Sequence, residues 1–171
     1  MDWLAWFASR HTWFVHLPAA AAVLVPLPIL AAQRGGRGIR PWWTTCRYLA
    51  WAGVIGAVLA VLSGFLQARH LGLVPADAYW GPALPGRSYL FRVHQLGGVA
   101  SLLLGLACLR SLYRQRQDHQ GIGLFALLFG VLWGACALVT SYDGAYLLGR
   151  SPAPPILLGT ALPGSGTRMM P

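Results

Sequence analysis

Four long stretches without a charged residue constrain the fold of this chain more than any other feature. They cover residues 12–32, 48–68, 93–109 and 120–142, and are 21, 21, 17 and 23 residues long. About 20 residues of α-helix are needed to cross the roughly 30 Å hydrocarbon layer of a bilayer. Of the 171 residues, 56% are hydrophobic and 10% are charged, which is more apolar surface than a soluble domain of this size can bury. The sequence therefore predicts an all-α integral membrane protein, a four-helix bundle with up-down-up-down topology.

The segments outside these stretches set the limits of the bundle. We place the spans at about 12–33, 46–70, 92–112 and 120–148, within a transmembrane bundle that covers residues 1–150. Residues 151–171 are rich in proline and glycine and lack a helical period, so we expect an extended tail. The first eleven residues have no basic region before the apolar stretch and no small-residue cleavage site, and we expect them to be retained.

The arginines predict the orientation of the bundle. Seven arginines flank or occupy the loops after the first and third spans, and six are spread over the longer segments at the other side: Arg34, Arg37, Arg40, Arg47, Arg110, Arg114 and Arg116 against Arg10, Arg69, Arg87, Arg92, Arg150 and Arg168. The positive-inside rule then places both termini outside, in a multi-pass membrane protein. The net charge of +9 fits this topology and attraction to anionic lipids, and we expect no nucleic-acid partner.

Four of the five histidines gather toward the outer side. Counted from the first arginine beyond the inner end of each span, His16 and His94 lie 18 and 16 residues away, or roughly 27 and 24 Å up. His11 and His70 each lie 23 residues away, roughly 35 Å up, at or beyond the outer boundary. Pro26 loosens the lower half of the first span, which affects the first of these depths by several ångströms.

Two level histidines on different helices of a bundle are the arrangement that ligates a b-type haem. We therefore take His16 and His94 as the predicted metal ligands. His11 and His70 form a second level pair for another haem or metal, or are interfacial residues. An alternative for His16 is a hydrogen bond to the carbonyl that Pro18 leaves without a helical donor.

Other residues are candidates for the surroundings of this haem. Gly97 and Gly98 belong to a stripe of small residues after His94, which leaves a groove for a flat ring or simply allows close helix packing. Arg69 and Arg92 lie at the same end and are suited to pair with haem propionates. Asp143 in the fourth span would orient an imidazole or accept a proton from a quinol, or else form an ion pair or a helix-ending turn.

The order and spacing of the histidine motifs resemble those of a known protein family. The stretches are HTWFVHLP, LSGFLQARH, VHQLGG and SYDGAYLLGR, spread over roughly residues 11–150. The chain resembles a bacterial family of four-helix inner-membrane proteins of unassigned function, whose first span begins His-Pro-x-x-Val-His-Phe-Pro and whose third begins with histidine, and which are similar to b-type cytochrome membrane subunits. Thr12 and Leu17 depart from that pattern. The resemblance implies a four-helix bundle and draws attention to His11, His16 and His94.

These observations lead to two hypotheses about function. The first is a membrane electron-transfer subunit that binds haem b near the periplasmic face and passes electrons between quinol and a periplasmic cytochrome or a larger redox complex. It would be a non-catalytic redox subunit of an oxidoreductase. The second is a cofactor-poor scaffold among other membrane subunits of a respiratory or photosynthetic complex, or a variant in which one histidine holds a chlorophyll. The three cysteines form no CxxCH motif, which excludes covalent c-type haem.

Overall fold

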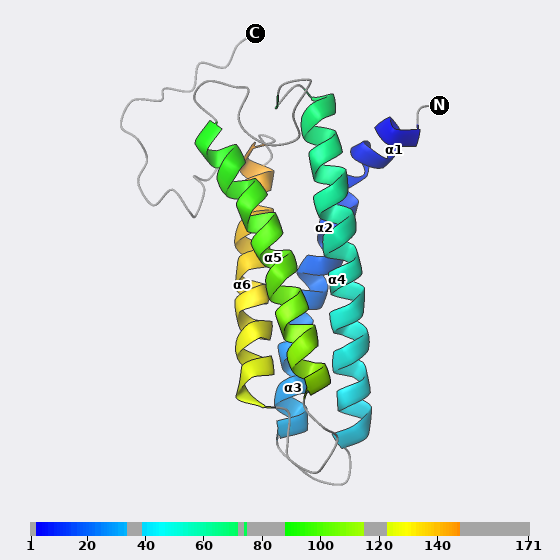
Figure 1. Cartoon of the computed structure of the whole chain (residues 1–171), viewed down its shortest axis with the longest axis vertical. Helices are drawn as coiled ribbons and strands as arrows, with labels where there is room; N and C mark the ends of the chain where they lie inside the picture. The colour runs from blue at the N-terminus through cyan, green and yellow to red at the C-terminus, as the bar shows by residue number, and fades with distance from the viewer. Residues whose placement is uncertain (1–2, 34–38, 72–73, 75–87, 115–122, 148–171) are drawn as a thin grey trace.

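The structure, a computed structural model, describes residues 3–33, 39–71, 74, 88–114 and 123–147. This part of the chain is all α-helical, and its helices pack as a bundle (Figure 1). The helices are α1 (Trp3–Ser9), α2 (His11–Leu24), α3 (Pro26–Gln33), α4 (Ile39–His70), α5 (Ser88–Arg114) and α6 (Leu124–Leu147). The predicted tail at 151–171 lies outside the described residues.

The described part of the chain contains four candidate membrane spans, which confirms the number predicted from the apolar stretches. They cover His11–Ala32, Pro41–His70, Phe91–Arg114 and Leu124–Ala145. The first is made of α2 and α3 together, and the others belong to α4, α5 and α6. Successive spans run in alternating directions along the long axis (Figure 1). The protein is therefore a multi-pass membrane protein built as a helical bundle.

The first span is interrupted where the sequence places two prolines. α2 ends at Leu24, and the Val25 N–H still donates to the Ala21 carbonyl at 2.8 Å. Pro26 has no N–H to give to the carbonyl of Ala22, so the helical ladder is broken there. Gly134 of α6 packs at this point, because a Cβ on it would lie 3.1 Å from the Ala22 carbonyl oxygen. The break in the first span is thus covered by α6.

An apolar core fills the bundle below the histidines. Its centre is Trp133 of α6, which is 0% exposed. The indole lies against Gly53 of α4 and Gly105 of α5, since a Cβ at either position would collide with it. The remaining buried core residues come from all four spans: Ala22, Val25, Ile29, Ala32, Cys46, Ala50, Val54, Cys108, Leu109, Leu112, Ala126 and Ala137. Small residues let the helices approach closely, which is how membrane bundles gain packing energy where lipid removes the hydrophobic driving force.

Candidate functional site

Two histidine rings meet inside the bundle near the end where α2 and α5 begin. His11 is the first residue of α2, and His94 lies in the second turn of α5. Their ring centres are 6.4 Å apart, and the ring planes are nearly perpendicular, at 88°. We call this pair and the residues that hold it the histidine end of the bundle.

Each ring is held by a hydrogen bond to a different helix. His94 Nδ1 lies 3.0 Å from the Thr140 carbonyl oxygen of α6, which can only accept, so Nδ1 carries the proton. His11 Nδ1 lies 3.1 Å from Ser63 Oγ of α4, and the Ser63 hydroxyl donates to the Ala60 carbonyl at 3.2 Å. With its own proton used there, the Ser63 oxygen accepts from His11 Nδ1–H. In the neutral form of both rings, Nε2 then carries the lone pair.

A glycine lies against the edge of each ring. A Cβ added to Gly64 of α4 would lie 2.8 Å from His11 Cε1, and a Cβ added to Gly144 of α6 would lie 2.6 Å from His94 Cε1. Both separations are shorter than carbon atoms tolerate, so any larger residue would push the ring away. All four spans thus contribute to the histidine end: the rings come from α2 and α5, and their hydrogen-bond partners and glycines from α4 and α6.

A carboxyl group lies beside the pair. Asp143 of α6 is 0% exposed and directly precedes Gly144. It interacts electrostatically with His94. Among the described residues, no group of three or more histidine, cysteine or acidic side chains has the geometry of a metal site. Asp143 therefore neighbours the pair without completing a three-ligand set with it.

The structure brings together only part of the predicted set of histidines. His94 meets His11, whereas His16 is exposed on the outside of the bundle, and His70 is exposed at the end of α4. Five residues along a helix correspond to a rotation of about 140°, so His11 and His16 cannot face the same neighbour. The structure thus brings His94 together with His11 and not with His16, and the role of these histidines as metal ligands stays a prediction.

The other predicted site residues lie around the pair in different ways. Arg69 and Arg92 are exposed near the ends of α4 and α5 at the histidine end. A Cβ at Gly97 would collide with the Thr140 side chain, so this glycine serves close packing of α5 on α6. At Gly98 the nearest atom to such a Cβ is Val61 Cγ2 at 4.0 Å, which leaves room. None of these positions shows whether a cofactor binds, and their proposed roles stay predictions.

Sequence reasoning assigned no role to four residues that hold the rings: Ser63, Gly64, Thr140 and Gly144. Ser63 and Gly64 lie in LSGFLQARH, and Thr140 and Gly144 lie at or beside SYDGAYLLGR, the stretches that carry the resemblance. The serine next to a glycine in LSGFLQARH was the sequence feature that could have indicated Ser63 and Gly64. The hydrogen-bond acceptor of His94 is the backbone carbonyl of Thr140, and because every residue has a carbonyl, the residue type at position 140 could not have indicated this role.

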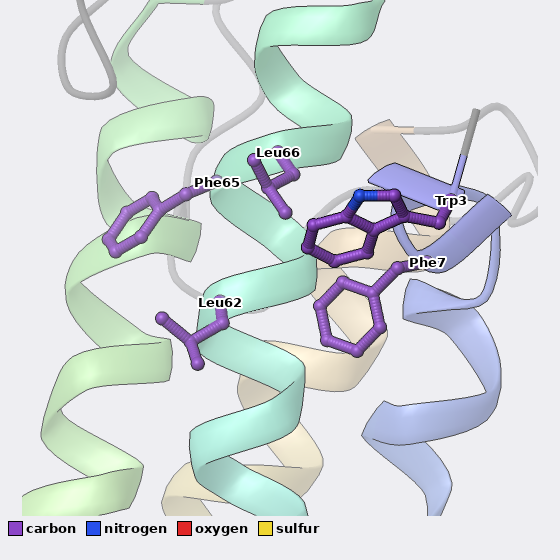
Figure 2. A pocket seen from close by; sticks show the side chains of 5 residues that line it. All are labelled: Trp3, Phe7, Leu62, Phe65 and Leu66. Atoms are coloured by element: carbon purple, nitrogen blue, oxygen red, sulfur yellow. The ribbon is translucent and has the colours of Figure 1, made fainter. Parts of the chain in front are cut away.

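An apolar pocket of about 380 Å³ lies beside the histidine end. Trp3 and Phe7 of α1 face Leu62 and Leu66 of α4 across it, and Phe65 completes the lining (Figure 2). Leu62 directly precedes Ser63, which holds His11. The short helix α1 thus forms an apolar recess against α4, and because Leu62 is exposed and Ser63 is buried, the recess and the histidine pair lie on different sides of that helix.

Comparisons with known proteins identify no family for this chain. No family model matches it, and neither a curated protein nor a solved structure shows significant similarity. The resemblance to bacterial four-helix inner-membrane proteins therefore stays a prediction from the motifs. What these residues establish is a multi-pass helical membrane bundle with a histidine pair inside it.

Proposed function

We propose that this chain is a membrane electron-transfer subunit that holds a b-type haem between His11 and His94. The observation that carries the proposal is a pair of imidazoles inside a membrane bundle, each with Nδ1 at hydrogen-bond distance from a partner on another helix. Nε2 is then the basic nitrogen of both rings, which is the form in which imidazole binds a metal. Hydrogen bonds from the other ring nitrogen fix the orientation of a ligating imidazole and raise its basicity.

The separation of the rings supports a shared metal ion. Two imidazoles would have to lie close together to hold one metal ion through one ring nitrogen each. The His11 and His94 centres are 6.4 Å apart. Haem provides four nitrogens to its iron, so two imidazoles are the whole set of protein ligands required.

The chain would contribute position and electrostatics, and the haem a one-electron change at its iron. Gly64 and Gly144 allow the two rings to pack directly against α4 and α6, which would fix the positions of the imidazoles. Arg69 and Arg92 are exposed at the same end and would bind the two propionates through charge-assisted hydrogen bonds.

Quinol is the proposed electron donor or acceptor within the membrane. The pocket lined by Trp3, Phe7 and Leu62 is apolar, has the size range of small-molecule sites, and lies against α4 beside the histidine end. The arginine distribution supports an orientation with both termini outside, in a bacterial inner membrane. The histidine pair would then lie near the periplasmic face, where a periplasmic cytochrome or a larger redox complex is the second electron partner.

A scaffold role is the alternative. The hydrogen bond from His94 to the Thr140 carbonyl ties α5 to α6, and that between His11 and Ser63 ties α2 to α4. Buried imidazoles that only connect helices would serve an accessory subunit of a respiratory or photosynthetic complex equally well. Measurement of bound haem separates the two functions.

The test is a dithionite-reduced minus oxidised spectrum, with pyridine haemochrome quantification, of the full chain purified from its native membrane with its partners. We expect b-type bands and about one haem per chain, as two axial ligands imply. His11→Ala and His94→Ala are each expected to abolish the bands. His16→Ala is the matched control, since it removes an exposed imidazole five residues from His11, and it should keep the full haem content.

Folding is checked by thermal unfolding of each variant. If an alanine variant does not fold, His11→Met decides, because a thioether keeps a weaker ligand and is expected to shift the bands rather than remove them. A wild-type spectrum without haem bands would overturn the proposal and favour the scaffold. Loss of haem in His16→Ala with retention in His11→Ala would overturn the assignment of the ligands.

A further inference from the structure

A second cluster lies at the opposite end of the bundle, where α4 begins and α5 ends. The guanidinium carbon of Arg47 lies 3.8 Å from the centre of the Tyr113 ring. The Trp51 indole N–H donates to the Tyr113 hydroxyl at 3.0 Å. Because Arg47 and Trp51 are one turn apart on α4, the three side chains join α4 to α5. We call them the arginine–tyrosine cluster.

The cluster holds a cation in a fixed place while leaving it accessible. A guanidinium stacked on an aromatic ring keeps N–H donors around its edge for a further partner. Tyr113 is 50% exposed and Trp51 is 44% exposed, so the cluster lies on the surface of the bundle. An arginine positioned in this way loses little side-chain freedom when it binds an anion.

Among the described residues, this end carries Arg47, Arg110 and Arg114 and no acidic side chain. Arg110 and Arg114 of α5 are exposed close to Tyr113 in the sequence. Among the described residues Asp143 is the one acidic side chain, and it lies at the histidine end. Because no described acidic side chain lies at this end, the arginines there favour an anionic partner.

We propose that Arg47, stacked on Tyr113, is the centre of a binding site for the phosphate group of an anionic phospholipid. Arg47 lies six residues inside the Pro41–His70 span, which is about 9 Å along the helix and suits the boundary between headgroups and hydrocarbon. Tryptophan and tyrosine prefer that boundary. The two free oxygens of a phosphodiester match the fork of N–H donors on a guanidinium. The site is independent of the proposed haem.

The test is native mass spectrometry of the full chain in neutral detergent, titrated with phosphatidylglycerol or with phosphatidylcholine of the same acyl chains. The wild type is expected to retain phosphatidylglycerol in preference. Arg47→Gln should weaken its binding about fivefold, since one arginine near a membrane surface contributes about that much. Phosphatidylcholine binding should not change. Arg47→Lys keeps the charge without the planar fork and is expected to give an intermediate loss.

Arg10→Gln is the matched control. Its guanidinium carbon lies 5.4 Å from the centre of the Trp6 ring, so the variant removes the same charge from another arginine over an aromatic ring, in the histidine-end region of the chain. We expect less than about a twofold effect there, because distant exposed charges are screened.

Equal losses in the Arg10 and Arg47 glutamine variants would overturn the site in favour of general attraction by net charge. Displacement of phosphatidylglycerol by millimolar inorganic phosphate would overturn the choice of a lipid and indicate a soluble anion. Thermal unfolding in phosphatidylcholine checks that each variant folds. If Arg47→Gln does not fold, Arg47→Lys decides: wild-type affinity for phosphatidylglycerol in that variant would overturn the role of the stacked fork.

Discussion

The histidine end of the bundle and the core below it are built alike but filled differently. In both regions, glycines on neighbouring helices receive a flat ring. In the core, the ring is the Trp133 indole, which lies against Gly53 and Gly105 and is surrounded by aliphatic side chains and buried cysteines. This ring contributes packing, because dispersion contacts are what hold membrane helices together.

At the histidine end, the flat rings are imidazoles, seated on Gly64 and Gly144. Each imidazole is tied to another helix through Nδ1. A polar ring inside a bilayer is costly without such a partner, and here each imidazole has one. The comparison teaches that glycines on neighbouring helices allow a membrane bundle to hold planar rings, whether these rings are apolar or polar.

The largest effect is expected from removing the ring in the core. Trp133→Ala leaves a cavity at the centre of the bundle and should lower the free energy of unfolding by on the order of 3 kcal/mol, from the cavity volume alone. Trp13→Ala is the matched control, because Trp13 is 71% exposed and faces outward. The measurement is thermal or denaturant unfolding in detergent. Equal stability of the two variants would contradict the role of Trp133 as the packing centre.

An intermediate effect on stability is expected from adding a side chain to a glycine that contacts one of the histidine rings. Gly144→Ala places a methyl group where His94 Cε1 now lies, so the ring must shift, at a cost of about 1–3 kcal/mol. Gly130→Ala adds the same methyl group to α6 at ordinary contact distance, 3.6 Å from Pro26 and Val25, and should be neutral or slightly stabilising, since alanine favours helix. Under the proposed function, bound haem is lost in the first variant only. Full haem content in Gly144→Ala would show that the contact between Gly144 and His94 is not needed for haem binding.

The smallest effect is expected from a single hydrogen bond. Ser63→Ala removes the acceptor of His11 Nδ1–H and should lower stability by about 0.6 kcal/mol, the usual contribution of an interhelical hydrogen bond in a membrane protein. Thr45→Ala is the control, because its hydroxyl donates to the Pro41 carbonyl within the same helix, on the surface. A shift of the haem midpoint potential in Ser63→Ala alone would show that the bond tunes a ligand. Identical behaviour of both variants would leave Ser63 without a role in holding His11.

Most of the fold could be predicted because bilayer thickness limits the length of a span. The four uncharged stretches each became a span, and the weak point expected from Pro26 became the break between α2 and α3. α4 begins at Ile39 rather than near 46, because a helix continues past the apolar stretch into the interface, where Trp42 and Trp43 are favourable.

The site could be predicted only in part. Depth along a helix follows from counting residues, and it placed His94 and His16 at one level, but depth says nothing about rotation. The spacing of five residues already shows that His11 and His16 point to different sides of their helix. Which of the two would meet His94 depends on how α2 is rotated against α4 and α6, and that is fixed by contacts such as Pro18 on Gly56 of α4. A single sequence does not specify those contacts.

The break at Val25 divides the first span into two helical segments, α2 and α3. His11 lies 14 residues from Val25, so the arm is about 21 Å long, and a tilt of about 5° at the joint would move the imidazole by about 2 Å. Gly134 of α6 presses against the Ala22 carbonyl at that joint. A partner that displaces α6 there would change the gap between the two rings without touching either of them.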